Sequence, residues 1–274
     1  MTPISRWWQA LRRSPGWVPG AMTAVVLALV IGGLGLAEIV SAASTGSQPG
    51  PSHRAAGTKL ANSAASGHRL RTSCRAVAHI GDSTSVGLVS ADYLPNPAQR
   101  LAAQYADVGV RHATINASGG RSIVEALPGQ VNGYDTARQM ATAGFRGCWV
   151  VALGTNDTAN VSVGSKVGRL ARIAELMSVA RGAPVLWVNV KTLDPDGPSA
   201  ESNMRLWNAA LTQACHQYPN LRVFDWAAVA QDGWFSSDGI HYTSAGYAAR
   251  ARLIARALAH AFPDSGHSTG CLVS

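Results

Sequence analysis

From Cys74 onward the sequence alternates short apolar runs with longer segments of helical periodicity. A strand followed by a helix and then by another strand of the same sheet forms a parallel pair, because the crossover helix returns the chain to the edge from which it started. Parallel sheets are covered by helices on both faces, so this alternation predicts an α/β fold. The five runs are Arg75–Ile80, His112–Ala117, Cys148–Leu153, Val185–Val190 and Leu221–Phe224.

The segments between and after these runs predict five helices. The last begins at Thr243 or Ser244, since both residue types are favourable N-caps, and continues to about Phe262. In sheets of this kind ligands bind at the carboxyl ends of the strands, so the residues that follow each run are the candidates for chemistry. The other expected helices lie near Pro97–Asp107, Thr136–Ala143, Val163–Ala180 and Ser202–Tyr218.

An uncharged segment near the N-terminus predicts a membrane anchor. Residues 17–37 contain no charged side chain, and about 20 apolar residues span a bilayer. The arginines that precede this segment keep residues 1–16 in the cytoplasm by the positive-inside rule and place the rest of the chain outside. We therefore expect a transmembrane signal anchor at 17–40. The alternative is a signal peptide cleaved at the small residues 40–42, which would release the protein.

Residues 41–73 consist mainly of Ala, Ser, Gly, Thr and Pro. Such a segment cannot bury enough apolar surface to fold, so we expect a flexible linker before a folded domain at 74–264 and a C-terminal tail at 265–274. Seven of the 23 basic residues but only one of the 15 acidic residues precede Cys74. The chain from Cys74 onward therefore has 16 basic and 14 acidic residues. A domain with balanced charge lacks the basic face of a nucleic-acid-binding protein, and we expect no nucleic-acid partner.

The first run is followed by Gly81-Asp82-Ser83, within HIGDSTSVGL. Gly, Asp and Ser are common turn residues, so this tripeptide alone indicates a turn at least as readily as a nucleophile. A serine hydroxyl becomes a strong nucleophile only when a base accepts its proton. His241 is the natural candidate for that base, and Asp238 precedes it in the same short loop, where it could orient the imidazole. We predict Ser83, Asp238 and His241 as the catalytic residues.

Hydrogen-bond donors that could stabilise a tetrahedral oxyanion follow the first three apolar runs. The candidates are the backbone N–H of Ser83, the backbone N–H of Gly120 and the side-chain amide of Asn156. Gly120 fits because this backbone must approach the substrate closely and adopt an unusual φ; Gly119 is the alternative. Taken singly, the glycines could form a turn, Asn156 could cap a helix and His241 could lie on the surface. Their occurrence in order after successive strands favours the catalytic interpretation.

These motifs resemble the sequence blocks of the SGNH/GDSL hydrolases over about residues 75–262. That family comprises serine esterases and acyl-transfer enzymes, and the resemblance implies a flavodoxin-like three-layer α/β/α fold with a five-stranded parallel sheet. It also implies the same roles for the residues predicted above. An Ala-rich, Lys-poor composition suggests an actinobacterial-type member. The matching segments are Gly81-Asp82-Ser83, Asn116–Ser122 (NASGGRS), Gly154–Asp157 (GTND) and Asp238–His241 (DGIH).

Two further residues are candidates for substrate binding. Arg121 stands where the family often has an acidic or small polar residue, and it could meet an anionic group or form a surface ion pair. Trp234 lies near the His241 loop and could stack on a sugar, as could Trp226, for which core packing is the alternative. Ser83 lacks the second glycine of the G-x-S-x-G elbow, which excludes an ordinary α/β-hydrolase.

The chain has four cysteines on a segment that we expect to be exported. If the first and third strands are neighbours, as in a flavodoxin-like order, Cys74 and Cys148 lie at the same depth of the sheet, and we predict a disulfide between them. Cys215 and Cys271 would then tether the C-terminal tail. Buried free thiols are the alternative. No Cys/His cluster has metal-ligand spacing, and we expect neither a metal nor a cofactor.

These features together predict a membrane-tethered, extracytoplasmic serine esterase. Its expected substrates are O-acyl esters of cell-envelope carbohydrate or lipid. One alternative is an acyltransferase that moves the acyl group onto an envelope glycan. Another is a non-catalytic envelope-binding module.

Overall fold

The structure of the protein, a computed structural model, describes residues 70–266, 268 and 270–274. The expected cytoplasmic terminus at 1–16, the expected anchor at 17–40 and most of the expected linker lie outside these residues. Among the residues that the structure describes, no helix has both the length and the apolar character needed to cross a membrane.

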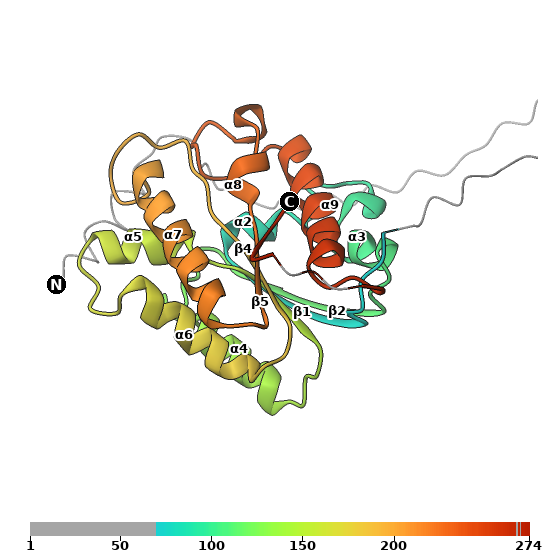
Figure 1. The fold of residues 1–274 in the computed structure, drawn as a ribbon. Helices are drawn as coiled ribbons and strands as arrows, with labels where there is room; N and C mark the ends of the chain where they lie inside the picture. Colours follow the sequence, from blue (N-terminus) through green and yellow to red (C-terminus); the bar gives the residue numbers. More distant parts are fainter. Residues whose placement is uncertain (1–69, 267, 269) are drawn as a thin grey trace, which may run out of the picture. The chain divides into compact units, whose positions relative to one another are not determined.

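Six parallel strands form one sheet between layers of helices (Figure 1). Their order is β2-β1-β3-β4-β5-β6, so the first five follow the flavodoxin-like order that the resemblance implied. The central strands β3 and β4 are buried along their whole length, as expected for a parallel sheet covered on both faces. The strands are β1 (Ala76–Gly81), β2 (His112–Ala117), β3 (Cys148–Ala152), β4 (Val185–Val188), β5 (Leu221–Phe224) and β6 (Leu272–Val273).

The sixth strand corrects the expectation of five strands followed by a separate tail at 265–274. β6 pairs in parallel with β5, where the N–H of Asp225 donates to the carbonyl of Val273. The sequence could not reveal it, because two residues are too few to show the alternation that identifies a strand. Residues at the end of the expected linker also join the domain. Thr72 is buried, and its hydroxyl donates to the Phe262 carbonyl at 2.8 Å.

Helices cover both faces of the sheet (Figure 1). They are α2 (Ser83–Val86), α3 (Leu101–Asp107), α4 (Gly133–Thr142), α5 (Thr155–Ser162), α6 (Arg169–Ala180), α7 (Glu201–Gln217), α8 (Trp226–Val229) and α9 (Ser244–Ala261), with the 3₁₀ turns η1 (Pro97–Gln99) and η2 (Asp232–Trp234). Residues of α4, α6 and α7 form one core cluster with the sheet, and residues of α3 and α9 form the other. Trp149 and Val150 of β3 enter different clusters, because successive strand residues point to opposite faces.

One expected helix is shorter in the structure. The helix expected at Val163–Ala180 begins only at Arg169, because a loop that contains Gly164 at a φ of 95° occupies the start of that range. A separate helix, α5, precedes this loop and starts inside the third motif. The last helix begins as expected, since the Thr243 side chain accepts a hydrogen bond from the N–H of Gly246.

Both predicted disulfides are present. Cys74 and Cys148, with an S–S distance of 2.00 Å, join the segment before β1 to the start of β3. The first and third strands are neighbours, as the prediction required, although Cys148 lies opposite Val77, three residues after Cys74, and not at the same depth as Cys74. Cys215 of α7 bonds to Cys271, directly before β6. This second bridge attaches the C-terminal strand to a helix of the core.

Candidate active site

Three of the four motif loops leave the sheet at the same level. Gly81 at the end of β1 lies opposite Ala117 at the end of β2 and opposite Ala152 at the end of β3. The chain that follows each strand therefore starts from the same edge. The fourth loop, which carries His241, lies between η2 and α9. Contacts between these loops determine whether the predicted residues meet.

Ser83 is the first residue of the short helix α2, so its backbone N–H has no acceptor within that helix. Asp82 caps the helix, and its carboxylate accepts hydrogen bonds from the N–H and the hydroxyl of Thr84 at 2.9 and 2.7 Å. A Cβ at Gly81 would overlap the side chain of Ser85. The Gly-Asp pair thus forms the turn, and this turn presents Ser83 at the sheet edge.

A buried hydrogen-bond chain holds α2 against the sheet. His79 of β1 contacts the Ser85 hydroxyl through Nε2 at 3.1 Å and the Tyr105 hydroxyl through Nδ1 at 2.9 Å. Burial, with a smaller contribution from the charge of Arg250, lowers the pKa of His79 to about 3. The imidazole is therefore neutral at pH 7 and links β1, α2 and α3. Its signal in the sequence was a histidine inside an otherwise apolar run.

The structure brings Ser83, His241 and Asp238 into one chain of hydrogen bonds. The Ser83 Oγ lies 2.8 Å from His241 Nε2, and His241 Nδ1 lies 2.6 Å from Asp238 Oδ2. An ionised carboxylate only accepts hydrogen bonds, so it keeps a proton on Nδ1 and leaves Nε2 able to accept the proton of the serine. A serine with an oriented base can act as a nucleophile.

Asp238 is itself held by three donors besides the imidazole ring. Its Oδ1 accepts hydrogen bonds from the Ser236 hydroxyl at 2.8 Å, from the Ile240 N–H at 3.0 Å and from the His241 N–H at 2.9 Å. Partial burial acts to raise the pKa of Asp238. The hydrogen bonds, with that of the His241 ring foremost, outweigh burial and lower this pKa to about 2. Asp238 is therefore ionised at neutral pH.

The loop after β4 supports the His241 loop, a role for which the sequence showed no sign. The N–H of Leu193 donates to the Gly239 carbonyl at 2.8 Å. Gly239 has a φ of 67°, in the left-handed region that favours glycine. The Thr192 hydroxyl donates to the Ser199 carbonyl at 2.7 Å and so closes the supporting loop. Backbone contacts of this kind have no residue-type signature that could have predicted them.

The conformation at the glycine pair distinguishes the two candidate backbone donors. Gly120 has a φ of 70°, whereas Gly119 is not among the residues with positive φ, which favours Gly120. Asn156 lies in the first turn of α5, and its Nδ2 donates to the Arg121 carbonyl at 3.0 Å. This amide has a second N–H, which could donate a hydrogen bond to an oxyanion. Gly120 and Asn156 thus lie on segments that contact each other directly.

Arg121 does not have the place that the sequence suggested. It is only 7% exposed, and its guanidinium donates to the carbonyls of Asn116, Gly81 and Val131 at 2.8, 3.3 and 3.2 Å. A fourth bond reaches the Asn116 side chain at 2.9 Å. These contacts contradict both a free anion-binding group and a surface ion pair. Instead, Arg121 attaches the loop that carries Gly120 to the ends of β1 and β2.

The two tryptophans near the His241 loop differ in burial. Trp226 is fully buried, and its Nε1 donates to the Tyr242 hydroxyl at 2.8 Å, so core packing is the correct alternative for this residue. Trp234 is half-buried and stacks on Trp226, with ring centroids 5.8 Å apart and planes 21° apart. The exposed part of Trp234 keeps it a candidate for substrate contact.

Residues 70–266, 268 and 270–274 contain no group of three or more His, Cys, Asp or Glu side chains that could hold a metal ion. The chemistry that the site does offer is that of an oriented serine nucleophile beside oxyanion donors. This arrangement defines a serine hydrolase of the acyl-transfer class.

The sequence matches the GDSL-like lipase/acylhydrolase family over residues 79–249, a range that contains all four motifs. The protein therefore belongs to this family and is an esterase-type enzyme, which disfavours a non-catalytic binding module. No curated protein matches the chain.

Solved structures share its fold. The lipase/acylhydrolase from Enterococcus faecalis is 15% identical, with 70% of this chain and 99% of that chain covered and a TM-score of 0.53. A carbohydrate acetylesterase family member from Sinorhizobium meliloti is 17% identical, with 67% of this chain and 95% of that chain covered and a TM-score of 0.50.

Proposed function

We propose that the protein is an extracytoplasmic serine esterase that hydrolyses O-acyl esters through an acyl-serine intermediate. The observation that carries this proposal is the hydrogen-bond chain from Ser83 Oγ through the His241 ring to Asp238, with distances of 2.8 and 2.6 Å. Such a chain supplies the base that a serine nucleophile needs and the carboxylate that orients this base.

The reaction has two steps. In the first, Ser83 Oγ attacks the ester carbonyl while His241 Nε2 takes its proton, and the same proton then passes to the departing alcohol. The N–H groups of Ser83 and Gly120 and the Asn156 amide stabilise the negative charge on the carbonyl oxygen. In the second step, water attacks the acyl-serine and gives its proton to His241; this proton then passes to Ser83 Oγ as the bond to the acyl group breaks and the carboxylic acid leaves.

The proposed substrates are acyl esters of cell-envelope carbohydrate or lipid. The uncharged segment at 17–37 supports export, either as a membrane anchor or as a cleaved signal. The two disulfides support the same location, because such bonds persist in oxidising compartments outside the cytoplasm. The half-buried Trp234 near the His241 loop offers a surface on which a sugar ring could stack.

Hydrolysis of a panel of esters by the purified full-length protein tests this function. The panel contains nitrophenyl esters from acetyl to palmitoyl together with O-acetylated sugars. We expect turnover of at least one class and a loss of about 10³-fold or more in Ser83→Ala. Equal turnover by wild type and Ser83→Ala would contradict the proposal, as would the absence of turnover across the panel.

Transfer of the acyl group to a glycan hydroxyl is the second candidate. It uses the same acyl-serine, and the openness of the site favours it: the side chains of His241 and Asp238 are 39% and 48% exposed, which leaves room for an acceptor larger than water. A burst of alcohol release followed by turnover that depends on an added sugar acceptor would indicate transfer. Turnover that is independent of acceptors would indicate hydrolysis.

A further inference from the structure

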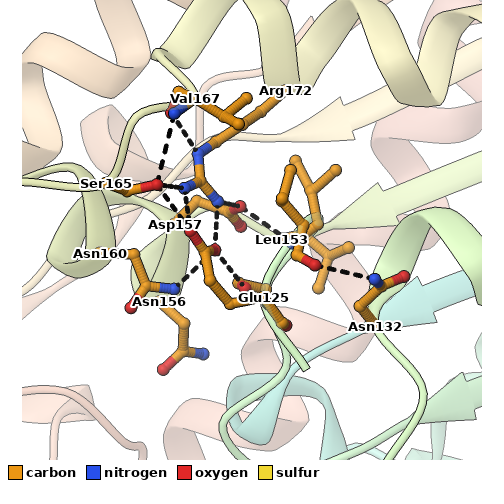
Figure 2. A network of polar contacts seen from close by, with 12 residues as sticks. Glu125, Asn132, Leu153, Asn156, Asp157, Asn160, Ser165, Val167 and Arg172 are labelled. Carbon is orange, nitrogen blue, oxygen red and sulfur yellow. Dashed lines mark hydrogen bonds and ion pairs between the residues drawn. The ribbon is translucent and has the colours of Figure 1, made fainter. Parts of the chain in front are cut away.

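An ionic cluster, with a buried arginine and a buried aspartate beside a glutamate that is 31% exposed, lies next to the candidate oxyanion donors. It consists of Glu125, Asp157 and Arg172, and Figure 2 shows the Arg172 guanidinium facing both carboxylates. Nη1 of Arg172 lies 2.8 Å from Asp157 Oδ1 and 2.6 Å from Glu125 Oε2. Nη2 donates to Glu125 Oε1 and to the Ser165 hydroxyl. The Arg172 and Asp157 side chains have no exposed surface.

This cluster is a costly way to stabilise a core. Removing ions from water costs several kcal/mol per ion, and apolar residues of similar size often pack at least as stably. One oxygen, Asp157 Oδ2, even lacks a hydrogen-bond partner among the described residues. A role in fixing one particular arrangement of the surrounding segments accounts for the cluster better than stability does.

The segments that the cluster joins are the loop after β2 and the helix α5. The loop contributes every second residue from 121 to 125, and the helix contributes residues from its first two turns. The bonds are Asn156 Nδ2 to the Arg121 carbonyl at 3.0 Å, the Ile123 N–H to Asp157 Oδ1 at 2.9 Å, and Asn160 Nδ2 to Glu125 Oε2 at 2.9 Å. Arg172 of α6 then bridges the two carboxylates of this set (Figure 2).

Two of the three candidate oxyanion donors belong to these segments. Gly120 directly precedes Arg121, and Asn156 itself donates the bond to the Arg121 carbonyl and directly precedes Asp157. We propose that Glu125, Asp157 and Arg172 are positioning residues that hold the Gly120 N–H and the Asn156 amide at the spacing that the oxyanion requires. This inference rests on the proposed function, because an oxyanion forms only if Ser83 attacks an ester. The cluster itself takes part in no reaction step.

The charges of the cluster agree with this placement. Burial acts to raise the pKa of Glu125, but hydrogen bonds from Arg172 and Ser165 outweigh it and lower this pKa to about 2. Burial raises the pKa of Asp157 to about 7 despite the opposing charge of Arg172. A proton on Asp157 removes one negative charge from the cluster, and the ionised Glu125 still pairs with Arg172.

Glu125→Gln in the full-length protein tests the inference, because it preserves the shape of the side chain but removes its charge. Preorganised donors act in the transition state, and a misplacement of about 1 Å costs about 100-fold. We expect kcat per active site, titrated with a fluorophosphonate, to fall about 10- to 100-fold, with KM changed by less than about threefold. Glu175→Gln, on the same helix α6 as Arg172 but outside the cluster, is the matched control and should retain wild-type kcat.

A double-mutant cycle separates positioning from simple loss of folded protein. If the cluster acts through the donors, adding Glu125→Gln to Asn156→Ala should cost much less than adding it to wild type. Should Glu125→Gln fail to fold, Ser165→Ala removes a neutral hydroxyl that donates to Glu125 Oε1 and accepts from Arg172 Nη2, each at 2.7 Å. This variant should lower kcat several-fold in the same direction.

Each outcome bears on a defined claim. A kcat per active site within about twofold of wild type, or additive costs in the cycle, would overturn the positioning role while the wild type still hydrolyses esters. Failure of the wild type to hydrolyse any ester would contradict the proposed function instead.

Discussion

Asp238→Asn is the substitution whose effect the geometry specifies most completely. The amide oxygen can still accept the hydrogen bonds that Asp238 Oδ1 receives, at 2.8–3.0 Å. The amide nitrogen then occupies the position of Oδ2, 2.6 Å from His241 Nδ1, where it donates a hydrogen bond. Nδ1 must therefore become an acceptor, and the imidazole proton moves to Nε2. In that tautomer His241 cannot accept the proton of Ser83.

The expected loss combines this tautomer change with a loss of charge. A carboxylate about 4 Å from an imidazolium stabilises it by about 4 kcal/mol at an effective dielectric of 20. Water screens this pair because the side chains of His241 and Asp238 are 39% and 48% exposed, which reduces the charge contribution to about 2 kcal/mol, or about 30-fold. In a comparable triad the tautomer and charge effects together cost about 10⁴-fold. We expect kcat/KM to fall about 10³- to 10⁴-fold.

Hydrolysis of a nitrophenyl ester at pH 7, with circular dichroism as a check of folding, measures this loss. The matched control is Asp194→Asn. Asp194 lies in the loop after β4, near Gly239, and its carboxylate has no hydrogen bond to His241 within the described part of the chain. We expect this control to stay within about threefold of wild type, because it leaves the hydrogen bonds between Asp238 and His241 in place. A loss below about tenfold in folded Asp238→Asn would refute the orienting role of Asp238.

Three further predictions concern stability and the oxyanion loop. The Cys74–Cys148 bridge has a sequence separation of 74, so replacing both cysteines with serine should lower the free energy of unfolding by up to about 4.5 kcal/mol; an unchanged urea midpoint would contradict this. Burial raises the pKa of Asp157 from 3.8 to about 7, so the native state binds the extra proton and this residue's contribution to stability falls as pH rises from about 4 to 7. In Asp157→Asn this contribution should vanish, so the free energy of unfolding should depend less on pH between about 4 and 7 than it does in wild type. Parallel pH profiles of wild type and Asp157→Asn would contradict this prediction. Gly120 has a φ of 70°, so Gly120→Ala should lower the free energy of unfolding by about 1–2 kcal/mol and also lower kcat. Gly119→Ala, with open space around its Cβ, should keep wild-type stability. Equal effects of the two variants in thermal unfolding would argue against Gly120 as the oxyanion glycine.

Much of the site was predictable because parallel strands send their carboxyl ends to one edge. Gly81 and Ala152 lie opposite each other, so the loops that carry Ser83 and Asn156 had to emerge together once the strands were recognised. The spacing of Asp238 and His241 within one short loop likewise limited how far apart their side chains could lie. These inferences needed only element types and their order.

Other features depended on where side chains point, which sequence patterns do not encode. Arg121 follows the oxyanion glycine, but only the packed structure shows that its guanidinium reaches the carbonyls of Gly81 and Asn116. Arg172 lies in an amphipathic helix, where an arginine usually faces water. Its partner Glu125 is 47 residues away in sequence, and no local pattern connects the two. Distant polar contacts of this kind are determined by tertiary packing.

Labelling of the intact protein with a fluorophosphonate tests most directly whether Ser83 is the nucleophile. The reagent bonds to a serine Oγ only where a base and oxyanion donors activate that oxygen. We predict one adduct per wild-type chain, located at Ser83 by peptide mass spectrometry, no adduct in Ser83→Ala, and strongly slowed labelling in His241→Ala. An adduct on another residue, equal labelling of Ser83→Ala, or a folded wild-type protein that remains unlabelled would contradict the account.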